Sequence, residues 1–585
     1  MNPRLLLPII GAVQGALLYW LYRAAKDHSW PATEPVAFGL FAALAVGLTA
    51  IIYLSQATGM PLRRRALLIA LMALAYALLG AYAGWVSGSR VFGEGPSHAA
   101  NALAAAILGF MLVPLVSGWN AAPQENPQGQ YGRWNYHLLY DIAWRNAVLC
   151  LTSGVLTGIF WMVLLAGAGL LKSLGLGAFF DLIKEPEFFI PASCIAAGEA
   201  FALGLSRAEL LVSLRRFWMT LTAWFLPLLL CFAVVWVIAL PFTGPDELFS
   251  TRMAAFFLLW FAALCINFLN SAWQDGNEAV YGTRLQVLVA ALWLTLPVVV
   301  GVAGIALQQR IAQYGWTDDR IWAAFVWLLA AGYVTGYALS WLPALKRRGW
   351  MAGVGNTNIT VALVMCTGLV LLLSPVLDPR RVSVNDQMAR LRAGLVKPDT
   401  FDYNYLRLQA GRWGTDALKV LAEEQGDERT RDIADRAKQA LALRAARGLD
   451  GPHNLERDPA RSRIRMIPKE TVLADALLDR IRDPKADYQE RQCLAPERKC
   501  IAWVRDLNKD GKDDVLLLSY QNPNDFPTVA IYSGGDDWKR VSTIHGSVRA
   551  EKWVAAMEAG KVVAEFPKWP DLVVDGVKSR VSVGQ

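Results

Sequence analysis

The apolar run FWMTLTAWFLPLLLCFAVVWVIAL covers residues 217–240 and contains no charged side chain. Because an α-helix rises about 1.5 Å per residue, a run of this length crosses the roughly 30 Å hydrocarbon core of a bilayer. Other apolar runs of similar length all lie before residue 377, and together they predict eleven transmembrane helices. We expect these helices near residues 5–22, 35–54, 66–86, 99–117, 146–171, 189–206, 217–240, 253–271, 285–307, 321–345 and 357–377.

The composition divides the chain into unlike parts. At 585 residues it is too long for one compact domain, and the charged residues are concentrated after the last apolar run. The sequence predicts an α-helical polytopic membrane protein, followed by an exported helical segment and a small α+β domain. The expected boundaries are 1–377 for the transmembrane domain, 378–450 for the helical juxtamembrane domain and 451–585 for the α+β domain with a calcium-type loop.

The net charge of +8 comes largely from Arg and Lys beside the apolar runs. Such residues set membrane topology, so we expect a lipid bilayer and no nucleic acid as the partner. The strongest basic clusters lie in the even-numbered loops, on the same side as the N-terminus with Arg4, which predicts a cytoplasmic N-terminus. An odd number of helices then places the C-terminal part outside. The first apolar run lacks a small-residue cleavage site, so we interpret it as a retained helix rather than a signal peptide.

After Ser374-Pro375 the chain predicts helices and then strands. The stretch SVNDQMARLRAG offers Ser383 as a helix cap, and two further stretches with helical spacing follow it. A linker over 448–463 and a helix over 469–481 are expected next, with another helix at 548–559. Short β-rich runs predict the strands, and these are CIAWVR, DVLLLSY, TVAIYS, KRVSTI, KVVAEF and SRVSV.

The stretch DLNKDGKDD, residues 506–514, has the spacing of a calcium-binding loop, with Gly511 at the sharp turn. The expected ligands are Asp506, Asn508, Asp510, Lys512 through its carbonyl oxygen, and Asp514. Leu517 stands where an EF-hand has its bidentate Glu, and the flanking runs are strand-like. The loop therefore resembles the DxNxDGxxD loops of β-propeller-type extracellular repeats. It predicts a structural Ca²⁺ site, and the alternative is a metal-free hairpin turn.

Two of the seven cysteines, Cys493 and Cys500, lie in polar surroundings, and the other five lie in or beside apolar runs. So close a pair is either a disulfide or half of a metal site. No second such pair completes a zinc site, which favours a disulfide in an oxidising compartment.

The segment RVSVNDQMARLRAGLVKPDTFDYNYLRLQAGRWGTDALKVLA, residues 381–422, resembles a family of bacterial multi-pass inner-membrane proteins known as domain of unknown function 4153. The resemblance extends over most of the chain. It implies a bacterial inner-membrane location, and the charge pattern then places the exported C-terminal domain in the periplasm. It carries no activity that can be transferred to particular residues.

Glu199 is the carboxylate set most deeply in an apolar run. Ionisable residues within a membrane are costly and often functional, so Glu199 is a candidate intramembrane polar site. The alternative is that residues 189–206 form a short re-entrant segment, with Glu199 near the interface or paired with an Arg.

His137, Asp141 and Arg145 are four residues apart in NYHLLYDIAWRNA and share one helix face. This face is a candidate for binding an anionic headgroup. The alternative is an interfacial helix with one Asp–Arg pair and a belt of aromatic residues. A further polar cluster is predicted on the same side of the membrane and is interpreted as a solvated loop; it comprises Asn267, Asn270, Gln274, Asp275 and Glu278.

The sequence contains no Walker A loop, no GxSxG, no HExxH and no Rossmann glycine pattern, so it favours a protein that is not an enzyme. The leading hypothesis is transport or lipid handling in the cell envelope. One alternative is a membrane-embedded transferase acting on a lipid-linked substrate, although the first exported loop offers only Asp27 and Glu34 as acidic residues. The other is a scaffold or sensor whose C-terminal domain binds an envelope protein.

Overall fold

A computed structural model divides the chain into two compact units, Met1–Leu449 and Asp450–Gln585, and each is described by itself. The described residues are 3–56, 58–87, 98–121, 130–243, 253–276, 280–340, 349–442, 464–467, 475–482, 493, 498–507, 513–522, 524–533, 538–545, 548–559, 561–562, 572–574 and 577–579.

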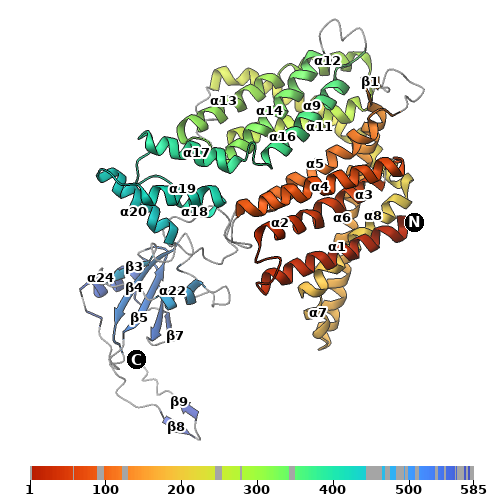
Figure 1. Ribbon diagram of the computed structural model, residues 1–585. Coiled ribbons are helices and arrows are strands. Elements are labelled where there is room, and N and C mark those ends of the chain that lie inside the picture. The colour runs from red at the N-terminus through yellow and green to blue at the C-terminus, as the bar shows by residue number, and fades with distance from the viewer. Residues whose placement is uncertain are drawn as a thin grey trace. The chain divides into compact units, whose positions relative to one another are not determined.

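The first unit consists of long apolar helices (Figure 1). Within its described residues, eleven segments are long and apolar enough to cross a membrane, which confirms the predicted number. The helices are α1 (Pro3–Lys26), α2 (Pro35–Ala43), the π-helical turn η1 (Leu44–Leu48), α3 (Thr49–Gln56), α4 (Leu62–Ser87), α5 (His98–Gly118), α6 (Tyr136–Ser173), α7 (Ala178–Leu182), α8 (Pro186–Ser206), α9 (Ala208–Thr243), α11 (Ala254–Trp273), α12 (Thr283–Trp293), α13 (Leu296–Tyr314), α14 (Asp318–Leu339) and α16 (Val354–Leu372).

Two of the eleven segments are interrupted. The second consists of α2, η1 and α3 in sequence, and Gly47 in η1 lies against the Tyr76 ring, where a Cβ would come within 2.9 Å of it. The ninth was predicted as one helix over 285–307 and is instead two, α12 and α13, separated at Leu294 and Thr295. Pro297 explains the break, because proline lacks an amide hydrogen and is tolerated in the first turn of a new helix.

The sixth segment, α8, is a continuous helix of 21 residues and not a short re-entrant piece. It packs closely along α1 through small residues. A Cβ at Gly11 would lie 2.4 Å from the carbonyl oxygen of Cys194, and one at Gly15 would lie 2.6 Å from the Cα of Pro191. Small residues of this kind allow membrane helices to approach each other closely.

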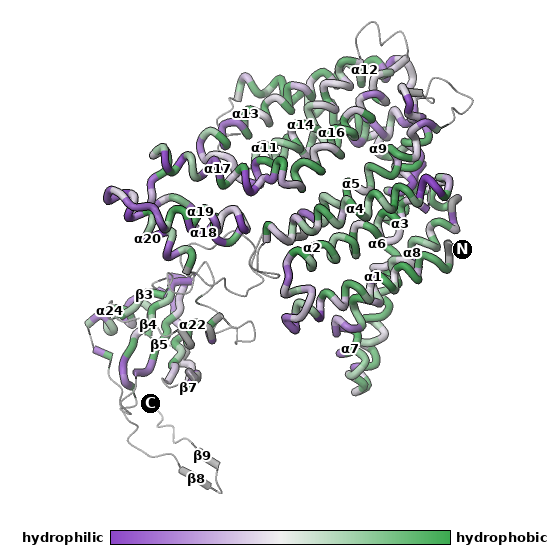
Figure 2. The backbone as a smooth tube through the Cα atoms, viewed as in Figure 1, coloured by the Kyte–Doolittle hydropathy of each residue, from purple (hydrophilic) through white to green (hydrophobic). Residues whose placement is uncertain are grey.

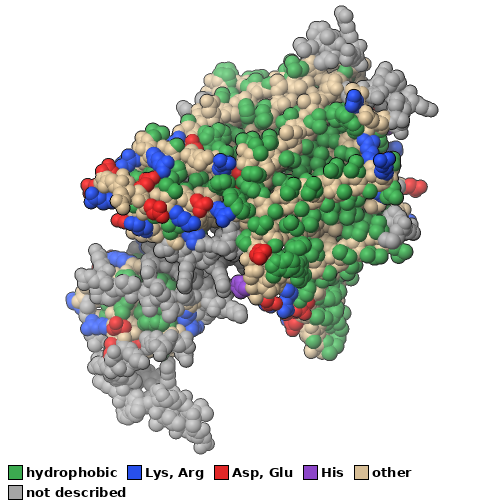
Figure 3. Space-filling view, in the orientation of Figure 1, with side chains coloured by type: hydrophobic (Ala, Val, Ile, Leu, Met, Phe, Trp, Pro, Cys, Tyr) green, Lys and Arg blue, Asp and Glu red, His purple; other side chains and the backbone are tan. Residues whose placement is uncertain are grey.

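The apolar helices pack into two groups. The first helix group is α1–α5 with α8, and the second helix group is α9 with α11–α14; each surrounds its own hydrophobic core. The helices α6 and α16 belong to both cores. Tyr136 of α6 and Val354 of α16 lie in the second core, while Leu149 of α6 and Cys366 of α16 lie in the first. Hydrophobic side chains cover the outer face over α1, α2, α4 and α5 (Figure 3).

Four hydrophilic helices follow α16 and complete the first unit (Figure 2). They are α17 (Pro379–Arg392), α18 (Tyr403–Leu408), α19 (Gly411–Glu423) and α20 (Glu428–Ala442). They lie at the opposite end of the helical bundle from the N-terminus of α1 (Figure 1), as an odd number of crossings requires.

The predicted helix cap at Ser383 is wrong. The helix α17 begins four residues earlier, at Pro379, and Asp378 caps it by accepting a hydrogen bond from the Arg380 amide at 2.9 Å. Asp followed by Pro at the first helical position is a strong start signal. Ser383 lies inside α17 and is buried.

The second unit contains a five-stranded sheet in the order β3-β4-β5-β6-β7, with β3 parallel to β4 and the other neighbours antiparallel. The elements are β3 (Ile464–Ile467), α22 (Asp475–Arg482), β4 (Lys499–Arg505), β5 (Asp514–Tyr520), β6 (Thr528–Ser533), β7 (Lys539–His545), α24 (Ala550–Glu558), β8 (Leu572–Val574) and β9 (Val577–Ser579). A hydrophobic core with α22 lies on one face of the sheet, and a core with α24 lies on the other. This is the predicted small α+β fold.

Four of the six predicted β-rich runs coincide with β4, β5, β6 and β7. Most of KVVAEF and of SRVSV lies outside the described residues. The sequence did not predict β3, whose four residues include an Arg. Cys493 and Cys500 form a disulfide within the α22 core, with their Cα atoms 5.6 Å apart, which confirms the predicted pairing.

Candidate functional site

The candidate site begins where a short hairpin leads into α6. The strands β1 (Gln130–Tyr131) and β2 (Trp134–Asn135) pair, and Asn135 caps α6 by accepting a hydrogen bond from the Leu138 amide at 3.2 Å. With 38 residues, α6 is about 57 Å long and exceeds the roughly 30 Å hydrocarbon core. Its first three turns carry His137, Asp141 and Arg145, so these residues lie toward the membrane surface.

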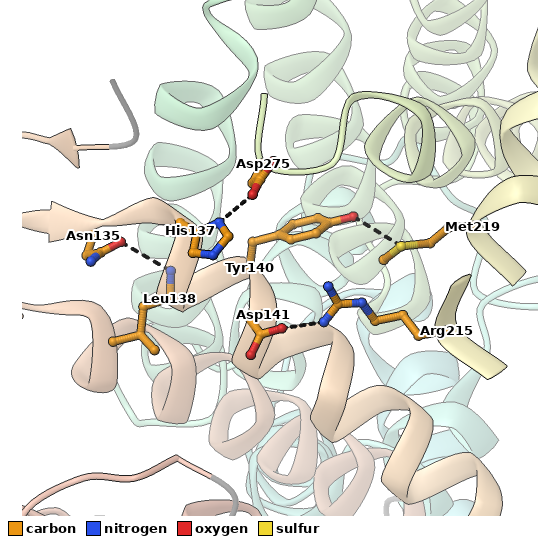
Figure 4. Close-up of polar contacts among 8 residues, drawn as sticks. All are labelled: Asn135, His137, Leu138, Tyr140, Asp141, Arg215, Met219 and Asp275. Atoms are coloured by element: carbon orange, nitrogen blue, oxygen red, sulfur yellow. Dashed lines mark hydrogen bonds and ion pairs between the residues drawn. The ribbon is translucent and has the colours of Figure 1, made fainter. Parts of the chain in front are cut away.

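His137 contacts the other predicted polar cluster. Its Nδ1 forms a hydrogen bond with the carboxylate of Asp275, which follows α11 (Figure 4). The His137 side chain is 44% exposed, whereas that of Asp275 is 15% exposed. Asp275 is therefore a largely buried partner of α6, and its interpretation as part of a solvated loop is wrong.

Asp141 is shared by two arginines. It accepts a hydrogen bond from Arg215 of α9 (Figure 4). Arg145 lies 3.9 Å from its other oxygen. All three side chains are half-buried. The predicted Asp141–Arg145 pair is thus present within a larger cluster, in which Arg215 is the closer cation.

A hydrogen-bonded ring lies beside these charges, formed by the buried Tyr337 and the half-buried Asn270 and Asn358. Asn270 Nδ2 donates to Tyr337 Oη at 2.9 Å, Tyr337 Oη donates to Asn358 Oδ1, and Asn358 Nδ2 donates to Asn270 Oδ1 at 2.6 Å. Asn358 Nδ2 also donates to Tyr136 Oη at 2.5 Å, and Tyr140 Oη donates to the Asn270 carbonyl at 3.2 Å. The ring joins α11, α14 and α16 to the start of α6. It therefore lies beside the second core, where α6 and α16 pack against α11 and α14.

One buried amide beside this cluster has no hydrogen-bond partner among the described residues. Asn146 is fully buried on α6, directly after Arg145, and neither its side-chain oxygen nor its nitrogen forms a hydrogen bond within the described part of the chain. Buried polar atoms are nearly always hydrogen-bonded to protein or water. A polar ligand group that reached Asn146 would find a hydrogen-bond donor in its amide nitrogen and an acceptor in its amide oxygen.

Glu199 is not part of this cluster. It lies on the outer side of α8, between the buried residues Gly198 and Ala200, and its neighbours one turn away, Ile195 and Leu203, are also exposed. Within the described residues no ion pair or hydrogen bond involves Glu199, so it is not paired with an Arg there.

The predicted calcium-type loop connects β4 to β5, two strands as expected. Asn508, Asp510 and Lys512 lie outside the described residues, while Asp506 and Asp514 are described. Asp514 is 3% exposed; one of its oxygens accepts a hydrogen bond from the Leu507 amide at 3.0 Å, and the other has no partner within the described residues. The described residues hold no group of three His, Cys, Asp or Glu side chains arranged for a metal.

Sequence reasoning missed Arg215, Tyr337 and Asn358 as members of the site. Arg215 is 74 residues from Asp141, and no local pattern pairs them. Asn358 did leave a signal, because GNTN places two asparagines at the start of the last apolar run.

The eleven long apolar helices define a polytopic helical membrane protein. Comparison with known families matches residues 21–424 to the family described as a domain of unknown function (DUF4153). The chain belongs to that family, and the matched region runs from α1 to the end of α19, so it includes the juxtamembrane helices. No curated protein matches the chain, and no solved structure matches it.

Proposed function

We propose that this protein handles or transports lipids in the bacterial inner membrane, and that it binds the anionic headgroup of its substrate at the Asp141 cluster. One observation carries the proposal: Arg145 and Arg215 share a single carboxylate at the junction of the two helix groups. The three side chains sum to one positive charge. A guanidinium has five N–H donors in a planar fork, so donors remain for a phosphate after Asp141 is bound.

The surroundings favour an amphiphilic ligand. The α9 residues beside Arg215 include Leu214 and Phe217, which are exposed, and the apolar length of α9 follows them. A headgroup at the arginines would leave its acyl chains against this surface. The proposed headgroup-binding residues are therefore Arg145 and Arg215, which Asp141 orients, with His137 on the same face of α6.

The packing of the helices supports movement of the ligand as well as binding. Many transporters place their substrate sites where two helix groups meet and move against each other. Here α6 and α16 belong to both cores, and the Asn270–Tyr337–Asn358 ring binds these two shared helices to α11 and α14 of the second helix group. The ring would therefore keep the shared helices attached to the second group if the groups moved against each other.

We also propose that the N-terminus is cytoplasmic and that the C-terminal unit is periplasmic, where it is available to an envelope partner. The basic residues at the N-terminal ends of α4 and α9 support the first assignment by the positive-inside rule. The Cys493–Cys500 disulfide supports the second, because disulfides persist in oxidising compartments. An alkaline phosphatase fused to the C-terminus should be active, and an inactive fusion would contradict this topology.

For the second unit we propose a structural Ca²⁺ at the β4–β5 loop, bound by Asp514 and the loop residues predicted from the sequence. The support is the buried Asp514 oxygen that lacks a partner within the described residues. Oxygen ligands of this kind suit calcium.

Lipid binding by the purified full-length protein tests the proposed function. Native mass spectrometry in detergent should show retained phosphatidylglycerol in preference to phosphatidylcholine. Replacing both arginines (Arg145→Gln with Arg215→Gln) should weaken this preference by about ten-fold, as expected for lost charged hydrogen bonds. Arg216→Gln is the matched control, because Arg216 is the exposed neighbour without an ion pair in the described residues. An unchanged preference in the double variant, or an equal loss in the control, would contradict headgroup binding at Asp141.

Reconstitution tests movement separately. Vesicles that contain the protein and a fluorescent phosphatidylglycerol should exchange the label between leaflets faster than protein-free vesicles. Exchange at the protein-free rate would contradict lipid translocation, even if binding were observed.

A further inference from the structure

A ladder of four side chains lies at the end of the membrane domain opposite the Asp141 cluster. It consists of Arg412, Trp85, Trp413 and Arg381 in that order. Arg412 lies over the Trp85 ring with its Cζ 4.6 Å from the centroid, and Arg381 lies over the Trp413 ring at 5.1 Å. The two indoles meet edge to face, with their centroids 5.3 Å apart.

The ladder is assembled from three elements that Asp378 holds together. One Asp378 oxygen accepts hydrogen bonds from Tyr82 Oη of α4 at 2.6 Å and from Trp413 Nε1 of α19 at 3.1 Å, and the other caps α17. Asp378 is 3% exposed. Gly411 adds a close backbone contact, because its φ is +61° and a Cβ there would lie 2.4 Å from the Val86 carbonyl. The two indole rings are therefore fixed in place before any ligand arrives.

The two arginines keep their hydrogen-bond donors available. A guanidinium stacked on an aromatic ring uses its face and leaves its N–H groups pointing outward in its own plane. Arg381 and Arg412 are both exposed, and within the described residues neither forms an ion pair or donates a hydrogen bond. The Asp378 carboxylate accepts hydrogen bonds from Tyr82, Trp413 and the α17 amide instead. The ladder thus presents two cations that form no ion pair within the described residues.

The residues around the ladder are of the kind found at a membrane surface. Trp85 is in the last turn of α4, and Arg381 comes nine residues after the end of α16. Val376 and Leu377, between α16 and α17, are exposed apolar side chains. Tryptophan and arginine beside apolar side chains are typical of the headgroup level of a bilayer.

We propose that this ladder binds the phosphates of anionic phospholipid headgroups in the leaflet at the α17 end. Arg412 and Arg381, at the two ends of the ladder, each bind the oxygens of a headgroup phosphate, and the acyl chains lie against the end of α4 and Val376. This site does not depend on the proposed function, because it shares no residue with the Asp141 cluster and lies at the opposite end of the helices. Its role is to anchor the juxtamembrane helices to that leaflet.

The test measures phosphatidylglycerol binding to the full-length protein in detergent by native mass spectrometry. The background protein carries Arg145→Gln and Arg215→Gln, so that the Asp141 cluster does not contribute to the binding. Adding Arg381→Gln and Arg412→Gln should weaken the remaining binding by about ten-fold or more. Arg392→Gln is the matched control on α17, because Arg392 is ion-paired with Glu424 at 2.7 Å. This control variant should bind phosphatidylglycerol as tightly as the background protein does. A melting temperature equal to that of the background shows that the variants are folded.

The result that overturns the proposal is unchanged binding in the Arg381 and Arg412 variant, or an equal loss in the Arg392 control.

A second experiment distinguishes a lipid ligand from a soluble phosphate. Glycerol phosphate at millimolar concentration should not displace the lipid, because it lacks acyl chains. Displacement at an affinity equal to that of the lipid would show a free-phosphate site and overturn the lipid assignment. Trp413→Leu should weaken binding as the arginine variant does, and unchanged binding there would contradict the stacked geometry.

Discussion

Ser383 donates a hydrogen bond to the main-chain carbonyl of Trp316 at 3.2 Å, and this bond ties α17 to the turn between α13 and α14. Other side chains of α17 bind the same turn. Asp386 accepts a hydrogen bond from the Trp316 amide at 2.8 Å, and Gln387 donates to the same Trp316 carbonyl at 3.0 Å. The segment that most resembles the family therefore has a structural task, which is to fix the juxtamembrane helices to the membrane helices.

Replacing Asp386 by Ala should loosen α17. The Trp316 amide would lose its acceptor, and we expect the free energy of unfolding to fall by about 1–3 kcal/mol. Thermal melting of the detergent-purified protein measures this. Asn385→Ala on the exposed side of α17 is the control and should melt as the wild type does. Equal melting of the Asp386 variant and the wild type would show that this bond contributes nothing.

Replacing Asn358 by Ala should weaken the packing of α16 against α11 and α14. The variant leaves Tyr337 without an acceptor and Asn270 without a donor in the ring, so we expect the free energy of unfolding to fall by about 1–3 kcal/mol. Asn356→Ala, which changes an exposed asparagine of the same helix, is the matched control. Melting curves of both variants check this, and similar shifts in the two would argue against the ring.

Glu199 should react with a membrane-soluble carbodiimide. The reagent partitions into the apolar phase, and Glu199 is an exposed carboxyl with no cation partner in the described residues. We expect peptide mass spectrometry to find the adduct on Glu199 and none in the Glu199→Gln variant. Glu187 is the internal comparison, because it lies at the start of α8 and pairs with Arg23 at 3.3 Å. Labelling of Glu187 in preference to Glu199 would contradict an outward-facing Glu199.

Calcium should stabilise the second unit if the β4–β5 loop binds it. Millimolar Ca²⁺ should raise the melting temperature of the full-length protein, because a ligand that binds only the folded state stabilises it. The Asp514→Asn variant keeps an acceptor for the Leu507 amide but loses the charge, so the shift should vanish while the fold remains. A wild-type protein that melts at the same temperature with and without calcium would remove this site.

The Cys493–Cys500 disulfide should form in cells. Thiol labelling of membranes prepared without reductant should leave both cysteines unmodified, and labelling after reduction should modify both. Replacing the pair by Ala should lower the stability of the second unit by about 2 kcal/mol, because a short closed loop constrains the unfolded chain. Modification of both thiols without reductant would place this unit in a reducing compartment.

The eleven apolar segments were predictable because each depends on a local run of side chains that a bilayer requires. The break between α12 and α13 also had a local cause in Pro297, but the apolar run continues across it and conceals it. The start of α17 was missed because Ser383 is a good cap in isolation, whereas Asp378-Pro379 is a better one. Arg215 and Tyr337 were missed for a different reason, since their partners are far away in sequence and only the packing of α9 and α14 brings them together.

Asp378 accepts hydrogen bonds from Tyr82, from Trp413 and from the first turn of α17. A single carboxylate therefore couples three distant stretches of the chain. When more members of the family are aligned, positions 82, 378 and 413 should co-vary. A relative that loses the acidic residue should also have lost the phenol or the indole that depends on it.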